Sequence, residues 1–205
     1  MIALLVVDVQ NDFMKGGALE VEKSLEIIPI INNLIKKFNE KKRLVVATLD
    51  WHPKEHKSFA INSNKVIGEK GILHGLDQIW WPVHCVANTL GSELYKELLP
   101  INNLIKKGTN INIDSYSGFF DNGKLEETDL KLTLKKNNIT QLYIVGLATD
   151  YCVLSTVLDA LELGYKVFLI QNACRGVNLL PEDSLNAIEL MKKKGANIIL
   201  EQDIV

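Results

Sequence analysis

The chain has 205 residues, of which 47% are hydrophobic and 23% are charged, and its formal net charge is −2 at pH 7. These values are typical of a globular protein with one core, so we predict a single domain over residues 1–205. The charge argues against nucleic acid or a membrane surface as the main partner, and neither a membrane-spanning run nor the basic start of a signal peptide is present.

Short apolar runs alternate with helical patterns along the chain. The predicted strands are Ile2–Val7, Arg43–Leu49, Asn103–Lys106, Gln141–Val145, Lys166–Ile170 and Asn197–Leu200. Helices are predicted for the stripe from Ile27 to Phe38 and for Thr89–Leu98, Leu130–Asn137, Tyr151–Leu163 and Glu182–Lys194. Repeated strand–helix units with apolar strands predict an α/β fold, a three-layer α/β/α sandwich on a six-stranded, mainly parallel sheet.

Two long loops, Asp50–Gly75 and Gly108–Gly123, interrupt this alternation, and loops of that length in a compact sheet usually serve function. Open α/β sheets bind ligands at the carboxyl ends of their strands. The polar residues expected there are Asp8, Asp50, Lys107 and Cys152. The sequence therefore predicts a site where two acids, a base and a thiol meet at one edge of the sheet.

Cys152 lies where the fourth predicted strand turns into a helix. Asp150 is the expected N-cap, which would make Cys152 the second helical residue. Unpaired backbone amides and the helix dipole favour a thiolate there and could also bind a developing oxyanion. The alternative is a buried, inert thiol. The three cysteines, an odd number without regular spacing, are typical of a reducing compartment, so a cytoplasmic location is expected.

Asp8 and Lys107 are candidate partners of this thiol. Burial at the end of a strand raises the pKa of a carboxyl group, which suits Asp8 as a general base. An ammonium at Lys107 would hold a thiolate and offset the carboxylate. Taken singly, each residue also fits a structural role, as a loop ligand or a solvated turn.

A second cluster has the composition of a metal site. Asp50 and His52 close the second strand, and His84 lies in a later segment near tryptophans. One carboxylate and two imidazoles fit Zn²⁺, Mn²⁺ or Fe²⁺, and Ser58 or His56 could complete the shell.

Six motifs in order along the chain are similar to those of a known family. They are Asp8-x-Gln10-x-Asp12-Phe13, Asp50-Trp51-His52-Pro53, Trp81-Pro82-x-His84-Cys85, Lys107-Gly108, Asp114-Ser115-Tyr116-Ser117-Gly118-Phe119 and Gly146-x-Ala148-x-Asp150-Tyr151-Cys152-Val153. Together they resemble the nicotinamidases (pyrazinamidases) of the isochorismatase-like cysteine hydrolase family, in an isochorismatase-like (Rossmann-like) fold.

The resemblance implies a catalytic triad of Asp8, Lys107 and Cys152. In the family the cysteine attacks the carboxamide of nicotinamide, ammonia leaves with a proton from the aspartate, and water hydrolyses the thioester to nicotinate. The amides of Ala148 and Cys152 would form the oxyanion hole, after a cis peptide between Leu147 and Ala148.

The resemblance also implies one divalent metal, zinc first and manganese or iron as alternatives, held by Asp50, His52 and His84. This metal would orient the pyridine nitrogen of the substrate. Of the two residues that could complete its shell, Ser58 aligns best with one variant of the family. Phe13, Trp81 and Tyr116 would line the ring pocket, again by resemblance. The expected partner is nicotinamide, and the expected setting is NAD salvage. The sequence leaves open whether the protein forms a homo-oligomer.

Two other functions remain in competition. A ureido or carbamoyl amidase would share the triad but would not need the Asp50, His52 and His84 set. A redox-sensing protein would use Cys152 as a reactive thiol and would need a resolving partner such as Cys85 or Cys174. The isochorismatase branch lacks the nucleophilic cysteine, so Cys152 argues against it.

Overall fold

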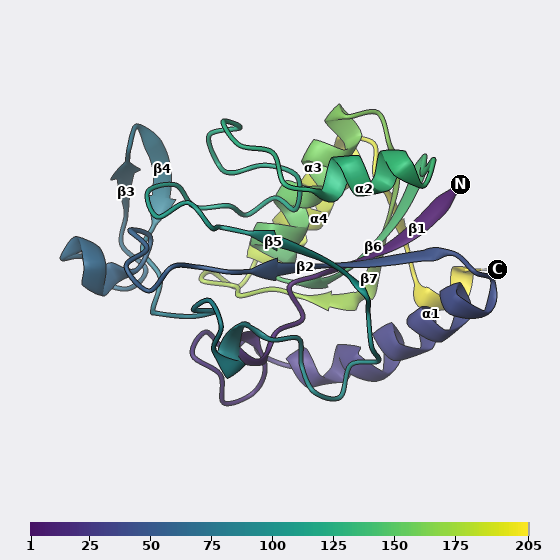
Figure 1. Ribbon diagram of the computed structural model, residues 1–205, viewed down its shortest axis with the longest axis horizontal. Coiled ribbons are helices and arrows are strands. Elements are labelled where there is room, and N and C mark those ends of the chain that lie inside the picture. The colour runs from purple at the N-terminus through teal and green to yellow at the C-terminus, as the bar shows by residue number, and fades with distance from the viewer. Residues whose placement is uncertain (205) are drawn as a thin grey trace.

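The computed structural model describes residues 1–204, and over that range six parallel strands form one sheet in the order β5-β2-β1-β6-β7-β8. The strands are β1 (Ile2–Val7), β2 (Leu44–Asp50), β5 (Asn103–Lys107), β6 (Gln141–Leu147), β7 (Lys166–Arg175) and β8 (Asn197–Ile199). Each lies on a predicted strand, and β7 continues beyond its predicted end. The N-terminus and the 3₁₀ turn Glu201–Asp203 lie at the end of the molecule opposite the carboxyl ends of the strands (Figure 1).

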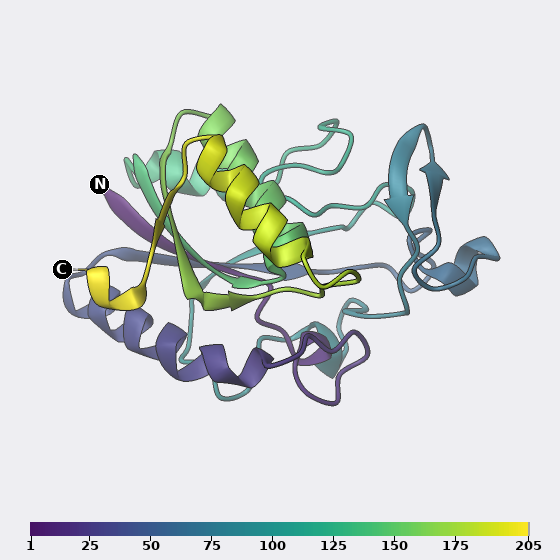
Figure 2. The ribbon, with the colours of Figure 1, turned by 180° about the vertical axis from the view of Figure 1, so that it is seen from behind.

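Helices cover both faces of the sheet (Figures 1 and 2). One face carries α1 (Ile28–Glu40), and the other carries α2 (Leu130–Lys136), α3 (Leu154–Glu162) and α4 (Asp183–Lys193). Alternate residues of β1 serve the two layers: Leu4 packs in the core with α1, and Leu5 packs with the other helices. The predicted three-layer α/β/α sandwich is confirmed.

The helix predicted for Thr89–Leu98 is wrong. Only a short 3₁₀ turn, Leu90–Ser92, forms there. The following backbone pairs with the loop after β1, because Asn11 donates to the carbonyl of Glu93 and Tyr95 donates to that of Val9. These tertiary hydrogen bonds outweigh the helical spacing of the apolar residues.

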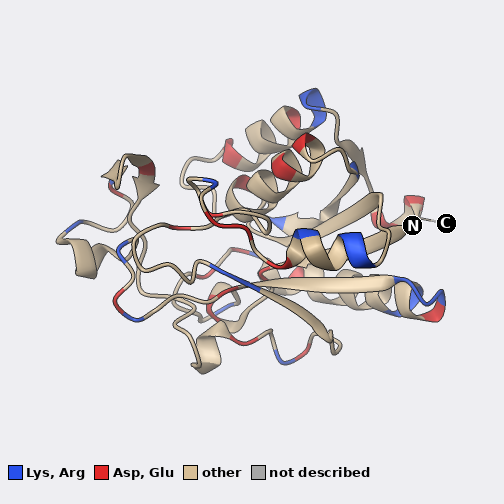
Figure 3. Ribbon diagram, turned by 45° about the horizontal axis from the view of Figure 1, so that its top comes forward, with Lys and Arg blue, Asp and Glu red and all other residues tan. Residues whose placement is uncertain are grey.

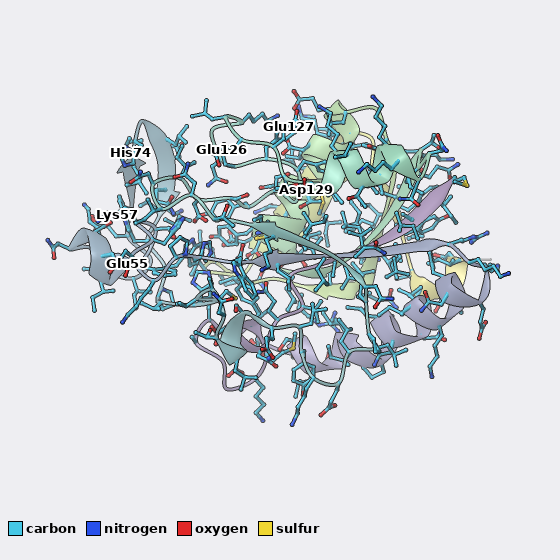
Figure 4. The ribbon with its side chains drawn as sticks, viewed as in Figure 1. Glu55, Lys57, His74, Glu126, Glu127 and Asp129 are labelled. Atoms are coloured by element: carbon cyan, nitrogen blue, oxygen red, sulfur yellow. The ribbon has the colours of Figure 1, made fainter. Side chains whose placement is uncertain are left out.

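An arm of residues 54–79 projects beyond the carboxyl ends of the strands (Figure 1). It contains a hairpin of β3 (Lys70–Leu73) and β4 (Leu76–Ile79), and β3 lies within the stretch Asp50–Gly75 that was predicted to be a loop. The hairpin turns at His74-Gly75, and both residues have positive φ, as a two-residue turn requires. Figure 4 shows Glu55, Lys57 and His74 on the arm, and Glu126, Glu127 and Asp129 on the segment that leads into α2.

Charged residues of both signs are interspersed over the helices and loops (Figure 3). Within residues 1–204, no helix combines the length and the apolar character that crossing a bilayer requires.

The centre of the sheet depends on a glycine. Gly146 pairs with Val7, has φ of +117°, and would place a Cβ only 2.1 Å from the carbonyl oxygen of Val7. We predict that Gly146→Ala lowers the free energy of unfolding by at least about 3 kcal/mol, because backbone atoms must move. Gly164→Ala is the control: its φ is also positive, but nothing lies within 4 Å of the added carbon. Urea unfolding that shows equal losses for both variants would contradict the steric explanation.

Candidate active site

The four neighbouring strands β5, β2, β1 and β6 bring the predicted residues together at their carboxyl ends. Asp50 and Lys107 are register partners at the ends of β2 and β5. Asp8 follows β1 directly, and Cys152 lies in the turn after β6. The structure therefore unites the acid, base and thiol that the sequence placed at one edge.

The ammonium of Lys107 is the centre of the site. Its Nζ lies 2.9 Å from Oδ2 of Asp8, 2.5 Å from Oδ1 of Asp50 and 3.3 Å from Sγ of Cys152. It also donates to the carbonyl oxygen of Ser115 at 2.8 Å. The two carboxylates raise the pKa of Lys107 well above its usual value against the opposing effect of burial, so this lysine is a fixed cation.

Asp8 is held by the turn at the end of β1. Its φ of 49° lies in the left-handed region, which aspartate tolerates better than most residues. The hydroxyl of Thr48 donates to Oδ1 of Asp8 at 2.6 Å. Burial raises the pKa of Asp8, and Lys107 opposes this shift. The direction matches the expectation for a general base.

The turn that carries Cys152 differs from the prediction. Residues Thr149–Val153 form a π-helical turn whose N-cap position is Ala148, so Asp150 is not the N-cap. Burial raises the pKa of Cys152 well above its usual value, while Lys107 lowers it and Asp8 raises it. This direction opposes the one that the helix-dipole argument favoured, because burial is the largest cause and the two carboxylates offset the nearby ammonium.

A pocket opens over the thiol. The expected residues Phe13, Trp81 and Tyr116 all line it, together with Ala148. The peptide bond between Leu147 and Ala148 is cis, which confirms the expectation. Trp81 donates from Nε1 to the hydroxyl oxygen of Tyr116 at 3.0 Å.

Sequence reasoning missed four further residues of the pocket wall: Leu19, Asp114, Tyr151 and Val177. Asp114 and Tyr151 belong to two of the six sequence motifs, and Tyr151 packs edge-on against Trp81, with 5.0 Å between ring centroids. Leu19 and Val177 are ordinary apolar loop residues, and nothing in the sequence marks them.

The predicted metal ligands also converge. Nε2 of His52 and of His84 lie 3.7 and 3.8 Å from Oδ2 of Asp50. The Nδ1 of each ring is directed at a backbone carbonyl, Gly108 at 2.9 Å and Pro82 at 2.8 Å, so each Nδ1–H donates and leaves Nε2 free to bind. Tetrahedral zinc requires ligand atoms about 3.4 Å apart, so a small closure fits this set to a divalent metal.

Ser58 and His56 are the two candidates for the fourth ligand of the metal. The Ser58 hydroxyl lies 2.7 Å from Nδ1 of His56 and so already has a protein partner. Among the described residues, Nε2 of His56 is a buried atom without a hydrogen-bond partner. His56 also groups with His52 and Asp114 as a set with potential ligand atoms close together.

The family model of the isochorismatase domain matches residues 2–203, so the chain belongs to the isochorismatase family. Within it, the chain is 46% identical to a nicotinamidase of Escherichia coli over 198 residues, 96% of this chain and 93% of that protein.

Solved structures give the same grouping. An Acinetobacter baumanii nicotinamidase–pyrazinamidase superposes with a TM-score of 0.93 at 39% identity, covering 100% of this chain and 98% of the other. A pyrazinamidase of Pyrococcus horikoshii in complex with zinc gives a TM-score of 0.81 at 42% identity, covering 97% and 98%.

Lys107→Met keeps most of the stem of the side chain and removes the charge. Two buried carboxylates then lose their cation, so we predict a loss of about 3–5 kcal/mol of stability at neutral pH. Without the ammonium, the folded-state pKa of Asp8, which burial already raises, rises further. The pKa of Asp50 also rises above its unfolded value, because the cation that lowers it most is gone. The folded state then binds more protons, and stability recovers as the pH falls.

In the same variant, iodoacetamide should alkylate Cys152 more slowly, because the pKa of the thiol rises further. Lys106→Met is the matched control, since Lys106 is exposed and lies over the ring of Trp51. Equal alkylation rates and equal pH dependence of unfolding in the two variants would contradict this role of Lys107.

Proposed function

We propose that the protein hydrolyses nicotinamide to nicotinate and ammonia through a thioester on Cys152, an activity of NAD salvage. The observation that carries the proposal is the buried contact of one ammonium with Asp8, Asp50 and the thiol, beneath an aromatic pocket. Similarity to nicotinamidases over nearly the full chain supports the same substrate.

In the first half of the reaction, Asp8 takes the proton of the Cys152 thiol as the sulfur attacks the carboxamide carbon. Burial raises the pKa of the thiol, and an adjacent base activates a thiol of raised pKa for attack. The Lys107 charge stabilises the anions that result, and the amides of Ala148 and Cys152 are assigned to the oxyanion. The C–N bond then breaks, and ammonia leaves with the proton that Asp8 returns.

The second half regenerates the enzyme. Water attacks the thioester carbon while Asp8 accepts a proton from it. The C–S bond breaks, nicotinate forms, and the sulfur recovers its proton from Asp8. Sulfur, water and both protons are accounted for, so the cycle needs no oxidant or reductant.

Asp50, His52 and His84 are assigned to one divalent metal, for which zinc is the first choice. When bound, the metal would engage the pyridine nitrogen and orient the ring. For a fourth protein ligand, the sequence favoured Ser58. His56 has less support, because its Nδ1 accepts from the backbone amide of Ser58 at 3.1 Å, which places the ring proton on Nε2. Phe13, Trp81 and Tyr116 form the walls that exclude water from the ring.

The alternatives have less support. A ureido or carbamoyl amidase leaves the convergence of Asp50, His52 and His84 unexplained. For a redox role, burial raises the pKa of Cys174 to about 12 and that of Cys85 well above its usual value, so neither is a ready resolving thiolate.

The activity is tested by ammonia release from nicotinamide against a panel of other amides. Cys152→Ala should abolish release while the protein stays folded, because the change removes one small atom. Cys174→Ala, at another buried thiol, is the matched control and should keep turnover. Wild-type-like release by Cys152→Ala would refute covalent catalysis through this residue.

Metal removal should weaken nicotinamide turnover and leave the thermal midpoint nearly unchanged, because the proposed ligands lie in loops and at a strand end. His84→Ala should lose bound metal, measured by elemental analysis, whereas His74→Ala on the hairpin turn should keep it. Cooperative unfolding on chelation would instead mark a structural metal.

A further inference from the structure

Asp150 is a partly buried acid that the catalytic cycle does not use. It lies two residues before Cys152, and its side chain turns toward the segment that follows β7. Oδ1 accepts a hydrogen bond from the backbone amide of Val177 at 2.9 Å, and Oδ2 accepts one from that of Asn178 at 2.7 Å. One carboxylate therefore holds two consecutive amides of a different strand connection.

This connection is also anchored from its other side. Figure 2 shows it running past the end of β7 before it returns to α4. Oδ1 of Asn178 accepts from the backbone amide of Ser184 in α4 at 3.0 Å. A Cβ on Gly176 would meet Oγ of Ser184 at 1.9 Å and Oδ1 of Asp150 at 2.9 Å, so the segment packs closely against both anchors.

Val177 stands between these two anchors, and its side chain lines the same pocket as Cys152 and Tyr151. Val177 is a β-branched residue with a stiff side chain, so its backbone position decides how far the side chain reaches into the pocket. The hydrogen bonds of Asp150 set that position.

We propose that Asp150 is a positioning residue that fixes Val177 as a wall of the reaction pocket and thereby limits the width of the ring carboxamide that fits. The inference rests on the proposed function and deepens it, since it names a determinant of substrate size. Pockets discriminate against an added group by the space that their walls leave.

The test compares nicotinamide with quinoline-3-carboxamide, which carries a second fused ring. Val177→Ala widens the pocket and should raise the ratio of kcat/KM for the larger amide over nicotinamide at least about fivefold, within the range expected for small groups in apolar pockets. Asp150→Asn retains one accepting oxygen and turns an NH₂ group toward an amide N–H, so it should release the segment and raise the same ratio.

A second readout separates positioning of Val177 from simple support of the nucleophile. The pH dependence of Cys152 alkylation by iodoacetamide should match wild type in both variants if Asp150 acts through the wall. Asp159→Asn is the matched control. Asp159 is a buried acid on α3, and its Oδ1 lies 2.9 Å from Nζ of Lys124. This variant should leave the kcat/KM ratio and the alkylation of Cys152 unchanged. If Asp150→Asn does not fold, Asp150→Glu keeps both oxygens, displaces the segment by one methylene, and should also change the ratio.

The inference is overturned if the Asp150 variant lowers kcat/KM for both amides by the same factor, or if Val177→Ala leaves the ratio unchanged. A wild-type protein that does not release ammonia from nicotinamide would refute the proposed function itself. An unchanged ratio in variants of an active wild type refutes only the inference.

Discussion

The buried ammonium of Lys107 is the interaction on which the rest of the site depends. Two carboxylates and a thiol cannot share a dry cavity without a cation, because unpaired buried charges are strongly destabilising. Asp50 connects this ammonium to the second cluster: Oδ1 contacts Lys107, and Oδ2 faces the two imidazoles. The carboxylate of Asp50 thus contacts both the lysine beside the nucleophile and the residues assigned to the metal that would orient the ring. Substrate position and thiol chemistry therefore both depend on Asp50.

The order of strands in the parallel sheet explains why these residues converge. Strands β5, β2, β1 and β6 are neighbours, so a polar residue at the end of each arrives at the same edge without a special loop. That is why the strands, the layers and the set of Asp8, Asp50, Lys107 and Cys152 could be predicted from the sequence. Apolar runs mark the strands, and polar residues at or shortly after the ends of these runs mark the site.

The parts that could not be predicted depend on contacts between distant segments. The spacing of Thr89–Leu98 is helical, yet backbone pairing with the loop after β1 determines its structure. Asp150 has the position of an N-cap, but its partners are 27 and 28 residues away. The raised pKa of Cys152 follows from burial and from the two acids around Lys107, and a local helix-dipole argument includes neither.

The central claim is that Cys152 carries the acyl group during turnover. It is tested most directly by quenching the protein in acid during steady-state hydrolysis of nicotinamide and analysing it by mass spectrometry. The account predicts an added nicotinoyl group on the peptide that contains Cys152, which disappears when the substrate is exhausted. Ammonia release without any acylated protein, or an acyl group on another residue, would contradict it.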